Sequence, residues 1–327
     1  MRSDTELDIS VIICTWNRAP VLARALERLA SIHLPSDLYW EVLIVNNNCS
    51  DDTEDVVRSF AGRLPIRSVI ETDQGLSAAR NRGIAESRGD LLLWIDDDVL
   101  VTDPWLGSYA KALLDFPRSS FFGGPILPFF DSPPPAWLRQ GWQQVSSAYG
   151  FRNLGTEPFA FTCKDLPYGG NFAVRRNVQE RFLFDAQLGR KDEQLLGGEE
   201  TDLMIRILRA GNEGLWLPDA KVEHLIGADR QSLRYLRRRY WSFGATEIRM
   251  SISRSREGEM PFPCRSVLGI PPWLLRRALE NEFQFWLTRW FADPQEWLVR
   301  FKNSSIQWGM ICERHRLHRS GAPLNPP

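Results

Sequence analysis

Residues 91–98 read Leu-Leu-Leu-Trp-Ile-Asp-Asp-Asp, an almost wholly apolar run that ends at three consecutive carboxylates. The run is continuous rather than alternating and is short for a helix, which is typical of a strand buried on both faces of a parallel sheet. Open α/β sheets bind ligands at the carboxyl ends of their strands. Three adjacent carboxylates need water or a divalent cation to stay ionised together, so the stretch predicts either a solvated acidic turn or a metal-binding edge.

Three strand–helix units precede this run. Apolar strands are predicted at residues 9–14, 40–45 and 66–70, and each is followed by a loop and a helix-like segment. Three such units that lead to a fourth strand imply right-handed crossovers and a mostly parallel sheet flanked by helices. The loops after the strands are then delivered to one edge of the sheet. The predicted fold class is α/β.

The overall composition is that of an ordinary globular protein, but its charge is unevenly distributed. The chain has 327 residues, of which 43% are hydrophobic and 25% charged, with a formal net charge of -1, so nucleic acid is not an expected partner. Residues 225–320, however, contain 17 Arg and Lys against 9 Asp and Glu. A basic segment of this size predicts contact with an anionic surface or ligand.

Cysteine usage and the lack of targeting signals favour a cytoplasmic protein. The five cysteines are scattered without Cys-x-x-Cys spacing, which predicts neither a disulfide framework nor a zinc site. Residues 1–8 are polar and acidic, unlike a signal peptide. No stretch approaches the roughly 20 apolar residues of a membrane span, so any membrane contact is expected to be peripheral, at the inner face of the cell membrane.

The chain is predicted to have two domains, residues 1–228 with the sheet and residues 229–327 as a basic, Trp-rich helical extension. Arg and Trp together on amphipathic helices suit a membrane surface, but they also suit a homodimer face or packing onto the main domain. Residues 125–155 are rich in Pro and aromatic residues and are predicted to be irregular. Their aromatic content favours a lid or a wall of an acceptor site over a plain linker.

Three further features are candidates for chemistry. Residues 198–203 read Gly-Glu-Glu-Thr-Asp-Leu and place acids in the first turn of a predicted helix, where they are favourable whatever the function. Gly169 and Gly170 precede a predicted strand and permit close backbone approach. His224 ends another short strand, and a lone histidine is more often structural than functional.

Taken in order, these motifs resemble an inverting family 2 glycosyltransferase of the GT-A fold, which is Rossmann-like. The resemblance covers roughly residues 8–225 and rests on five motifs in the family's order. They are residues 12–18 (Ile-Ile-Cys-Thr-Trp-Asn-Arg), 45–53 (Val-Asn-Asn-Asn-Cys-Ser-Asp-Asp-Thr), 79–84 (Ala-Arg-Asn-Arg-Gly-Ile), 96–98, as the family's Asp-x-Asp, and 198–203.

The resemblance implies a role for each matching residue. Glu200 would be the catalytic base, and Asp98 and His224 would hold Mn²⁺ or Mg²⁺. The residues implied to bind the nucleotide sugar are Thr15, Trp16, Arg18, Asn46, Arg80, Asp96 and Asp97. The residues implied to line the acceptor site are Gly170, Asn171, Glu199 and Asp202. Two positions depart from the family pattern: Asn46 stands where an acid commonly reads uracil, and Glu200 where aspartate is commoner.

The function implied is transfer of a sugar from a nucleotide-sugar donor to a hydroxyl of a glycan or lipid-linked acceptor. The expected donor is a UDP-sugar, and the expected process is the synthesis of polysaccharide or cell-surface glycan. Two alternatives stay open. A sugar-phosphate nucleotidyltransferase would have a glycine-rich loop after the first strand, whereas residues 15–18 contain no glycine. A catalytically silent glycan-binding or scaffold subunit would bind the donor or a glycan without turnover.

Overall fold

The described residues form two compact units. The computed structural model describes residues 7–34, 37–190, 197–256 and 269–320. The first unit contains the described residues up to Phe129, residues 150–190 and Glu199–Leu225. The second contains Phe130–Tyr149, residues 197–198 and the described residues from Ile226 onward. All residues assigned to the site from the sequence fall in the first unit.

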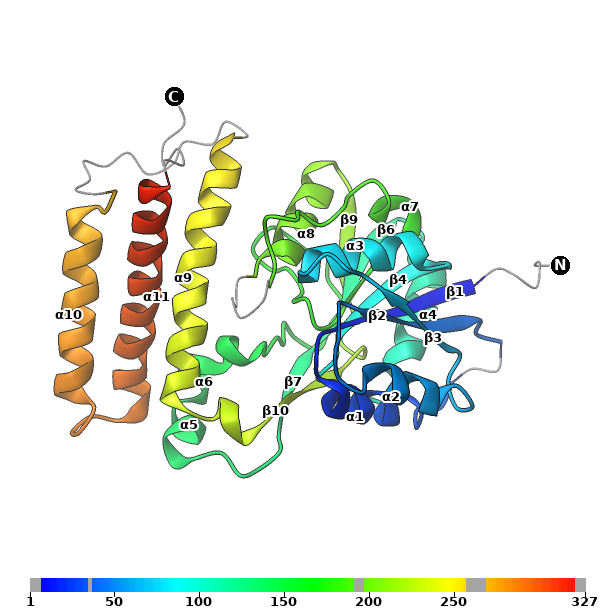
Figure 1. Cartoon of the computed structure of the whole chain (residues 1–327), viewed down its shortest axis with the longest axis horizontal. Coiled ribbons are helices and arrows are strands. Elements are labelled where there is room, and N and C mark those ends of the chain that lie inside the picture. Colours follow the sequence, from blue (N-terminus) through cyan, green and yellow to red (C-terminus); the bar gives the residue numbers. More distant parts are fainter. Residues whose placement is uncertain (1–6, 35–36, 191–196, 257–268, 321–327) are drawn as a thin grey trace. The chain divides into compact units, whose positions relative to one another are not determined.

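The first unit is built on a seven-stranded, mostly parallel sheet (Figure 1). In the order in which they lie side by side, its strands are β3 (Ile66–Ile70), β2 (Trp40–Asn46), β1 (Leu7–Thr15), β4 (Gly89–Asp96), β8 (Phe172–Arg175), β6 (Ser119–Gly123) and β9 (Glu213–Trp216). β8 runs antiparallel to both of its neighbours, and the other pairs are parallel. The order β3-β2-β1-β4 confirms the three predicted strand–helix units and places a topological switch point between β1 and β4.

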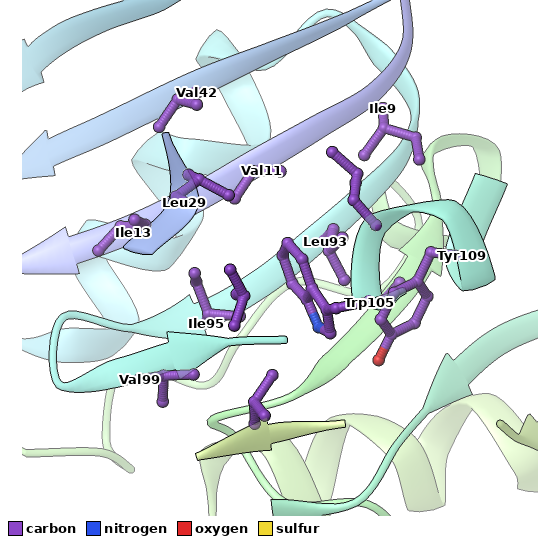
Figure 2. Close-up of a cluster of buried hydrophobic side chains, with 14 of the residues drawn as sticks. Ile9, Val11, Ile13, Leu29, Val42, Leu93, Ile95, Val99, Trp105 and Tyr109 are labelled. Carbon is purple, nitrogen blue, oxygen red and sulfur yellow. The ribbon is translucent and has the colours of Figure 1, made fainter. Parts of the chain in front are cut away.

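Helices cover both faces of this sheet. One face carries α1 (Ala19–Leu29), α2 (Thr53–Phe60) and α4 (Trp105–Asp115), and the other carries α3 (Leu76–Glu86), α7 (Arg176–Gln179) and α8 (Glu199–Arg209). β4 gives Leu91, Leu93 and Ile95 to the first face, and Leu92 and Trp94 to the second, because successive side chains of a strand point to opposite sides. Figure 2 shows the first cluster, with α4 side chains against those of the sheet. Burial on both faces explains the continuous apolar run.

A second, three-stranded sheet has the order β5 (Val99–Val101), β10 (Val222–Ile226) and β7 (Ile126–Phe130). β5 begins directly after the acidic triplet. β10 pairs antiparallel with β5, and in this register His224 lies opposite Val99. The small sheet therefore brings a histidine from a distant part of the chain to the acidic end of β4.

The second unit is helical. Its elements are α5 (Ala136–Gln140), α6 (Trp142–Val145), two short 3₁₀ helices (Ser146–Tyr149 and Ala228–Arg230), α9 (Leu233–Arg256), α10 (Pro272–Thr288) and α11 (Pro294–Arg319). The aromatic segment predicted to be an irregular lid or wall is ordered instead. Its Phe130, Trp137, Trp142 and Tyr149 pack in one hydrophobic cluster with α9 and α11. Tyr149 is buried and the other three are partly buried, so these aromatics pack into the core of the second unit.

The three long helices of the second unit lie side by side, with α11 between α9 and α10 (Figure 1). A Cβ on Gly309 of α11 would lie 1.9 Å from the carbonyl oxygen of Trp241 in α9, and one on Gly244 would lie 2.0 Å from that of Ile306. The crossing of α9 and α11 therefore requires glycine on both helices. Within the described residues, none of the helices combines the length and apolar content needed to cross a bilayer.

Candidate active site

The candidate site lies at the carboxyl ends of β1 and β4, which are neighbours in the sheet. In their parallel register Cys14 pairs with Asp96, so the residues that follow each strand leave the sheet side by side. This switch point is where open α/β sheets bind ligands. The Asp96 side chain is 37% accessible, whereas Asp97 and Asp98 are buried. Asp96 is therefore the carboxylate of the triplet that is best placed to meet a ligand.

Arg18 and Thr15 hold the two buried carboxylates. Arg18 Nη1 donates to Asp97 Oδ1, Arg18 Nη2 donates to Asp98 Oδ2 at 2.9 Å, and Thr15 Oγ1 donates to Asp97 Oδ2 at 2.8 Å. Burial raises the pKa of Asp97 to about 6; Arg18 and Thr15 counteract this rise, and the charge of Asp98 adds to it. Both Asp97 oxygens are thus used within the protein. The structure brings these four predicted residues together and makes Thr15, Arg18 and Asp97 a support for Asp98.

Asp98 and His224 form a pair of ligand atoms that suits a divalent cation. His224 Nε2 lies 3.4 Å from Asp98 Oδ2. Carboxylate oxygen and imidazole nitrogen are ligands for such ions, and Mg²⁺ sites are commonly completed by substrate phosphates and water. The described part of the chain contains no cluster of three protein ligands. The residues therefore fit a cation that also takes ligands from a bound diphosphate, and that cation would share Asp98 with Arg18.

Arg80 lies at the centre of a second group of acids. It is buried, and its Nη1 donates to Glu199 Oε1 at 2.7 Å. Its Nη2 lies 3.6 Å from Asp96 Oδ1, and its Nη1 lies 4.0 Å from Glu200 Oε2. Removing one partner of a buried ionic group costs about 3–5 kcal/mol, because the remaining charges are left uncompensated. We assign Arg80 the role of positioning these acids. Because it is buried, little of its surface is accessible to a bound substrate.

Gly169 and Gly170 bring the backbone between Asp96 and Glu200. A Cβ on Gly169 would lie 3.2 Å from Glu200 Oε1 and 2.9 Å from Arg80 Nη2. A Cβ on Gly170 would lie 3.5 Å from Asp96 Oδ2. A side chain at Gly169 would therefore force the ends of the Arg80 and Glu200 side chains to move. The carboxylates of Asp96 and Glu200, from distant parts of the chain, therefore lie beside two consecutive glycines of one turn.

Glu199 and Glu200 begin α8 and form a carboxyl pair. Burial raises the pKa of Glu199 to about 8; the neighbouring charge of Glu200 adds to the rise, and Arg80 opposes it. Oε2 of Glu199 and Oε2 of Glu200 are buried, and neither has a hydrogen-bond partner among the described residues. Two carboxylate oxygens cannot satisfy each other unless one bears a proton. A proton held by Glu199 supplies the missing donor.

Glu199→Gln is expected to flatten the pH dependence of stability. The pKa of Glu199 is about 8 in the folded state, against 4.5 for a glutamate side chain exposed to water. Its stabilising contribution is therefore fully present below pH 4.5 and is lost as the pH rises to about 8, with a slope of at most about 1.4 kcal/mol per pH unit. Urea denaturation at pH 5, 6.5 and 8 should show a steeper fall in the free energy of unfolding for wild type than for the variant. Equal slopes would contradict this assignment, and Glu213→Gln, at an exposed position of β9, should keep the wild-type slope.

Asn171 does not lie where the acceptor assignment requires. It is fully buried, and its Oδ1 accepts hydrogen bonds from Trp105 Nε1 and the Tyr109 hydroxyl, both at 2.9 Å. Its Nδ2 donates to the carbonyl oxygens of Pro125 and Ala220. All of its hydrogen-bonding groups are occupied inside the protein. Asn171 therefore fixes the base of the glycine turn from within the core and does not contact an acceptor.

Two other predicted residues also have partners within the protein. Arg206 Nε donates to Asp202 Oδ2 at 2.8 Å, one turn along α8. Asn46 is buried, and its Nδ2 donates to Glu54 Oε1 at 2.6 Å while its Oδ1 accepts from a backbone N–H of its own loop. Trp16, by contrast, is 38% accessible. Of these two residues, Trp16 is therefore the more accessible to a nucleobase.

Asn47 was not singled out in the sequence but has a clear supporting role. Its Nδ2 donates to the carbonyl oxygens of Glu71 and Asp73, and its Oδ1 accepts from the backbone N–H of Gly75 at 2.9 Å. These bonds fix the loop that precedes α3, the helix that bears Arg80. Three consecutive asparagines carry no local signal that tells which one holds a loop.

Comparison with known proteins identifies the family. The model of glycosyl transferase family 2 matches residues 10–180, just over half of the chain. Succinoglycan biosynthesis protein ExoM of Rhizobium meliloti (strain 1021) is 28% identical over 252 residues, which cover 75% of this chain and 75% of that protein. The probable glycosyltransferase YdaM of Bacillus subtilis (strain 168) is 27% identical over 218 residues, or 65% of this chain and 49% of that protein.

Two solved structures have a fold similar to that of this chain. Mannosyltransferase PcManGT from Pyrobaculum calidifontis, in complex with GDP-Man and Mn²⁺, matches with a TM-score of 0.60 and 17% identity, over 96% of this chain and 90% of that one. S. aureus TarS 1–349 matches with a TM-score of 0.51 and 15% identity, over 96% and 92% of the two chains. The motifs at the strand ends, the matching family model and this shared architecture together place the chain in glycosyl transferase family 2, with the GT-A fold.

Proposed function

We propose that the protein is a metal-dependent, inverting glycosyltransferase that moves a sugar from a nucleotide-sugar donor to a hydroxyl of a glycan or lipid-linked acceptor in polysaccharide or cell-surface glycan synthesis. One observation carries the proposal: Asp96 and Glu200 face consecutive glycines of one turn and are joined through Arg80 at the switch point of the sheet. Residues 1–228 would perform the transfer, and residues 229–327 would contact a membrane surface or a second copy of the chain.

Glu200 is the proposed general base. An acceptor hydroxyl must lose a proton as it attacks the anomeric carbon, and a carboxylate within hydrogen-bond reach can take that proton. Glu200 has one oxygen beside Gly169 and is held near Arg80. Glu199 is bound to the same guanidinium and orients the start of α8. Attack opposite the leaving group would convert an α-linked donor into a β-linked product.

Asp98 and His224 are the proposed ligands for Mn²⁺ or Mg²⁺, and Asp96 is proposed to contact the donor near its ribose. When bound, the cation would stabilise negative charge on the diphosphate leaving group as a Lewis acid. Arg18 and Thr15 keep Asp98 in place through Asp97 and the direct ion pair. This chain therefore supplies an anchored carboxylate at the place where a diphosphate would arrive.

Trp16→Ala is expected to weaken donor binding by about 1–3 kcal/mol, the range measured for aromatic stacking on a nucleobase. Trp16 follows β1 and presents an accessible ring, so its removal should not disturb the core. The expected signature is a higher KM for the donor with a small change in kcat. Titration calorimetry with the donor and Mn²⁺ checks it, and an unchanged dissociation constant would remove Trp16 from the nucleobase pocket. Tyr39→Ala, at another exposed aromatic of the first unit, is the matched control.

A thermal-shift screen tests the proposed function. UDP-glucose, UDP-galactose, UDP-glucuronate, GDP-mannose and dTDP-rhamnose are added with Mn²⁺ or with EDTA. A donor that binds only the folded state raises Tm by mass action. We expect one nucleotide class to raise Tm with Mn²⁺ and to lose that effect with EDTA, and slow donor hydrolysis with the same metal requirement. Donor binding without any turnover would favour the silent glycan-binding subunit.

A further inference from the structure

Helix α10 has an apolar face that is not covered by the rest of the described chain. Its buried side contains Leu274, Ala278 and Phe285, which pack within the second unit. The exposed side continues past the end of the helix. We call it the aromatic face, and it consists of Leu275, Leu279, Phe283, Trp286, Trp290 and Phe291, with accessibilities of 39%, 53%, 65%, 52%, 73% and 89%.

The aromatic face is a continuous stripe rather than a set of scattered residues. At 3.6 residues per turn, positions 275, 279, 283 and 286 fall within about 80° of one another on the helix surface. Eight of the fifteen exposed large hydrophobic side chains among the described residues lie between Trp273 and Phe291. Concentrations of this kind mark interaction sites, whereas single exposed apolar residues need no explanation.

One arginine, Arg289, lies among the rings of the aromatic face. It lies over the rings of Trp286 and Trp290, at 5.6 and 5.4 Å, whereas Arg277 lies over Trp273 on another side of α10. Within the described part of the chain, Arg289 has no acidic partner. Its charge can be neutralised by an outside anion.

The acids of α10 are already neutralised. Glu282 accepts hydrogen bonds from Arg237 of α9 at 3.0 and 3.1 Å, from Ser304, and from Trp286 Nε1 of the aromatic face at 3.0 Å. Glu280 accepts from Arg276 at 2.6 Å. The pairing with Glu282 also neutralises Arg237, one of the basic residues of α9, inside the second unit. The uncompensated positive charge is therefore found beside the aromatic rings of α10.

We propose that the aromatic face, with Arg289, binds the headgroup region of a bilayer that contains anionic phospholipid. Trp and Phe rings are favoured at this depth, and arginine can reach the lipid phosphates while its stem stays among apolar groups. Charge complementarity favours lipid over a second copy of the chain. A two-fold contact through this face would bring the uncompensated charges of two copies of Arg289 towards each other, and like charges placed together across an interface are unfavourable.

This inference extends the proposed function, because a lipid-linked acceptor is found at such a surface, but the binding itself requires no catalysis. The full-length chain is sedimented with vesicles of phosphatidylcholine alone or of phosphatidylcholine with one quarter phosphatidylglycerol. We expect tighter binding to the second type. The variant Phe283→Ser/Trp290→Ser/Phe291→Ser should lose at least about tenfold in partition onto both types, since it removes exposed apolar surface.

A charge variant and a matched control sharpen the test. Arg289→Gln should weaken binding to the anionic vesicles by about fivefold, from about 1 kcal/mol for one basic residue, with little effect on neutral vesicles. Leu114→Ser/Tyr39→Ser removes two exposed apolar residues from the first unit and should bind as wild type.

Three outcomes would overturn the proposal: no binding of wild type to either vesicle, binding that the triple variant retains, or a wild-type dimer in light scattering that the triple variant converts to monomer. The triple variant should keep the Mn²⁺-dependent donor shift in Tm. Lost vesicle binding with a retained donor shift separates this inference from the proposed catalytic function.

Discussion

A Glu200→Gln variant is expected to lose roughly 10²–10⁴-fold in kcat for sugar transfer, the usual contribution of a general base. Glutamine has the size of glutamate but cannot take the proton of an acceptor hydroxyl. The change removes one of the acids around Arg80, and Glu199 continues to bind that guanidinium at 2.7 Å. The fold should therefore survive, and the KM for the donor should change little. The measurement is release of nucleoside diphosphate from donor plus acceptor, with Tm as the check on folding.

Two controls accompany this variant. Glu213→Gln, at an exposed position of β9, should turn over as wild type. Glu200→Asp should retain part of the activity, because the chemistry of the carboxylate is kept while its reach is shortened. Near-normal turnover by a folded Glu200→Gln protein would remove Glu200 from the role of base.

An Asp98→Asn variant is expected to lose the Mn²⁺ dependence of donor binding and at least about 10²-fold in kcat, because a metal Lewis acid supplies several kcal/mol of charge stabilisation. Asparagine keeps an oxygen that can accept from Arg18 Nη2, which lies at 2.9 Å from Asp98 Oδ2. The ion pair between Arg18 and Asp97 is also retained. The loss should therefore come from the missing charge rather than from unfolding.

The measurement for Asp98→Asn is the donor-induced rise in Tm over a Mn²⁺ titration. Asp90→Asn is the matched control, since Asp90 is exposed near the other end of the same strand. An Asp98→Asn protein that still shows the wild-type rise at the wild-type Mn²⁺ concentration would show that the cation is held elsewhere.

The parts of this structure that could be predicted from sequence are those with local signals. Alternating strand and helix signals predicted β1, β2, β3 and β4 as parallel strands, and burial on both faces explains the continuous apolar runs of β1, β2 and β4. The motif order also predicted the family correctly. The strand after Gly170 was predicted as well and is β8, but its antiparallel place between β4 and β6 was not, because these neighbours are distant in the chain.

The parts that could not be predicted depend on long-range contacts. Arg80 and Glu199 are separated by 119 positions, and nothing near either residue reveals that they form a buried hydrogen bond. Asn171 follows two glycines and was assigned to the acceptor site, yet its four side-chain hydrogen bonds are all internal. The aromatic residues at 130–149 suggested a lid or a wall because the helices against which they pack, α9 and α11, begin only at Leu233 and Pro294.

The central claim is that Glu200 activates a hydroxyl on the face of the donor sugar opposite the diphosphate. Its most direct test is the stereochemistry of slow donor hydrolysis, with water as the acceptor, followed by ¹H NMR before the released sugar equilibrates. UDP-glucose is the first probe, replaced by whichever nucleotide sugar raises Tm in the screen. We predict that an α-linked donor releases the β-anomer first. Initial release of the α-anomer would contradict the account.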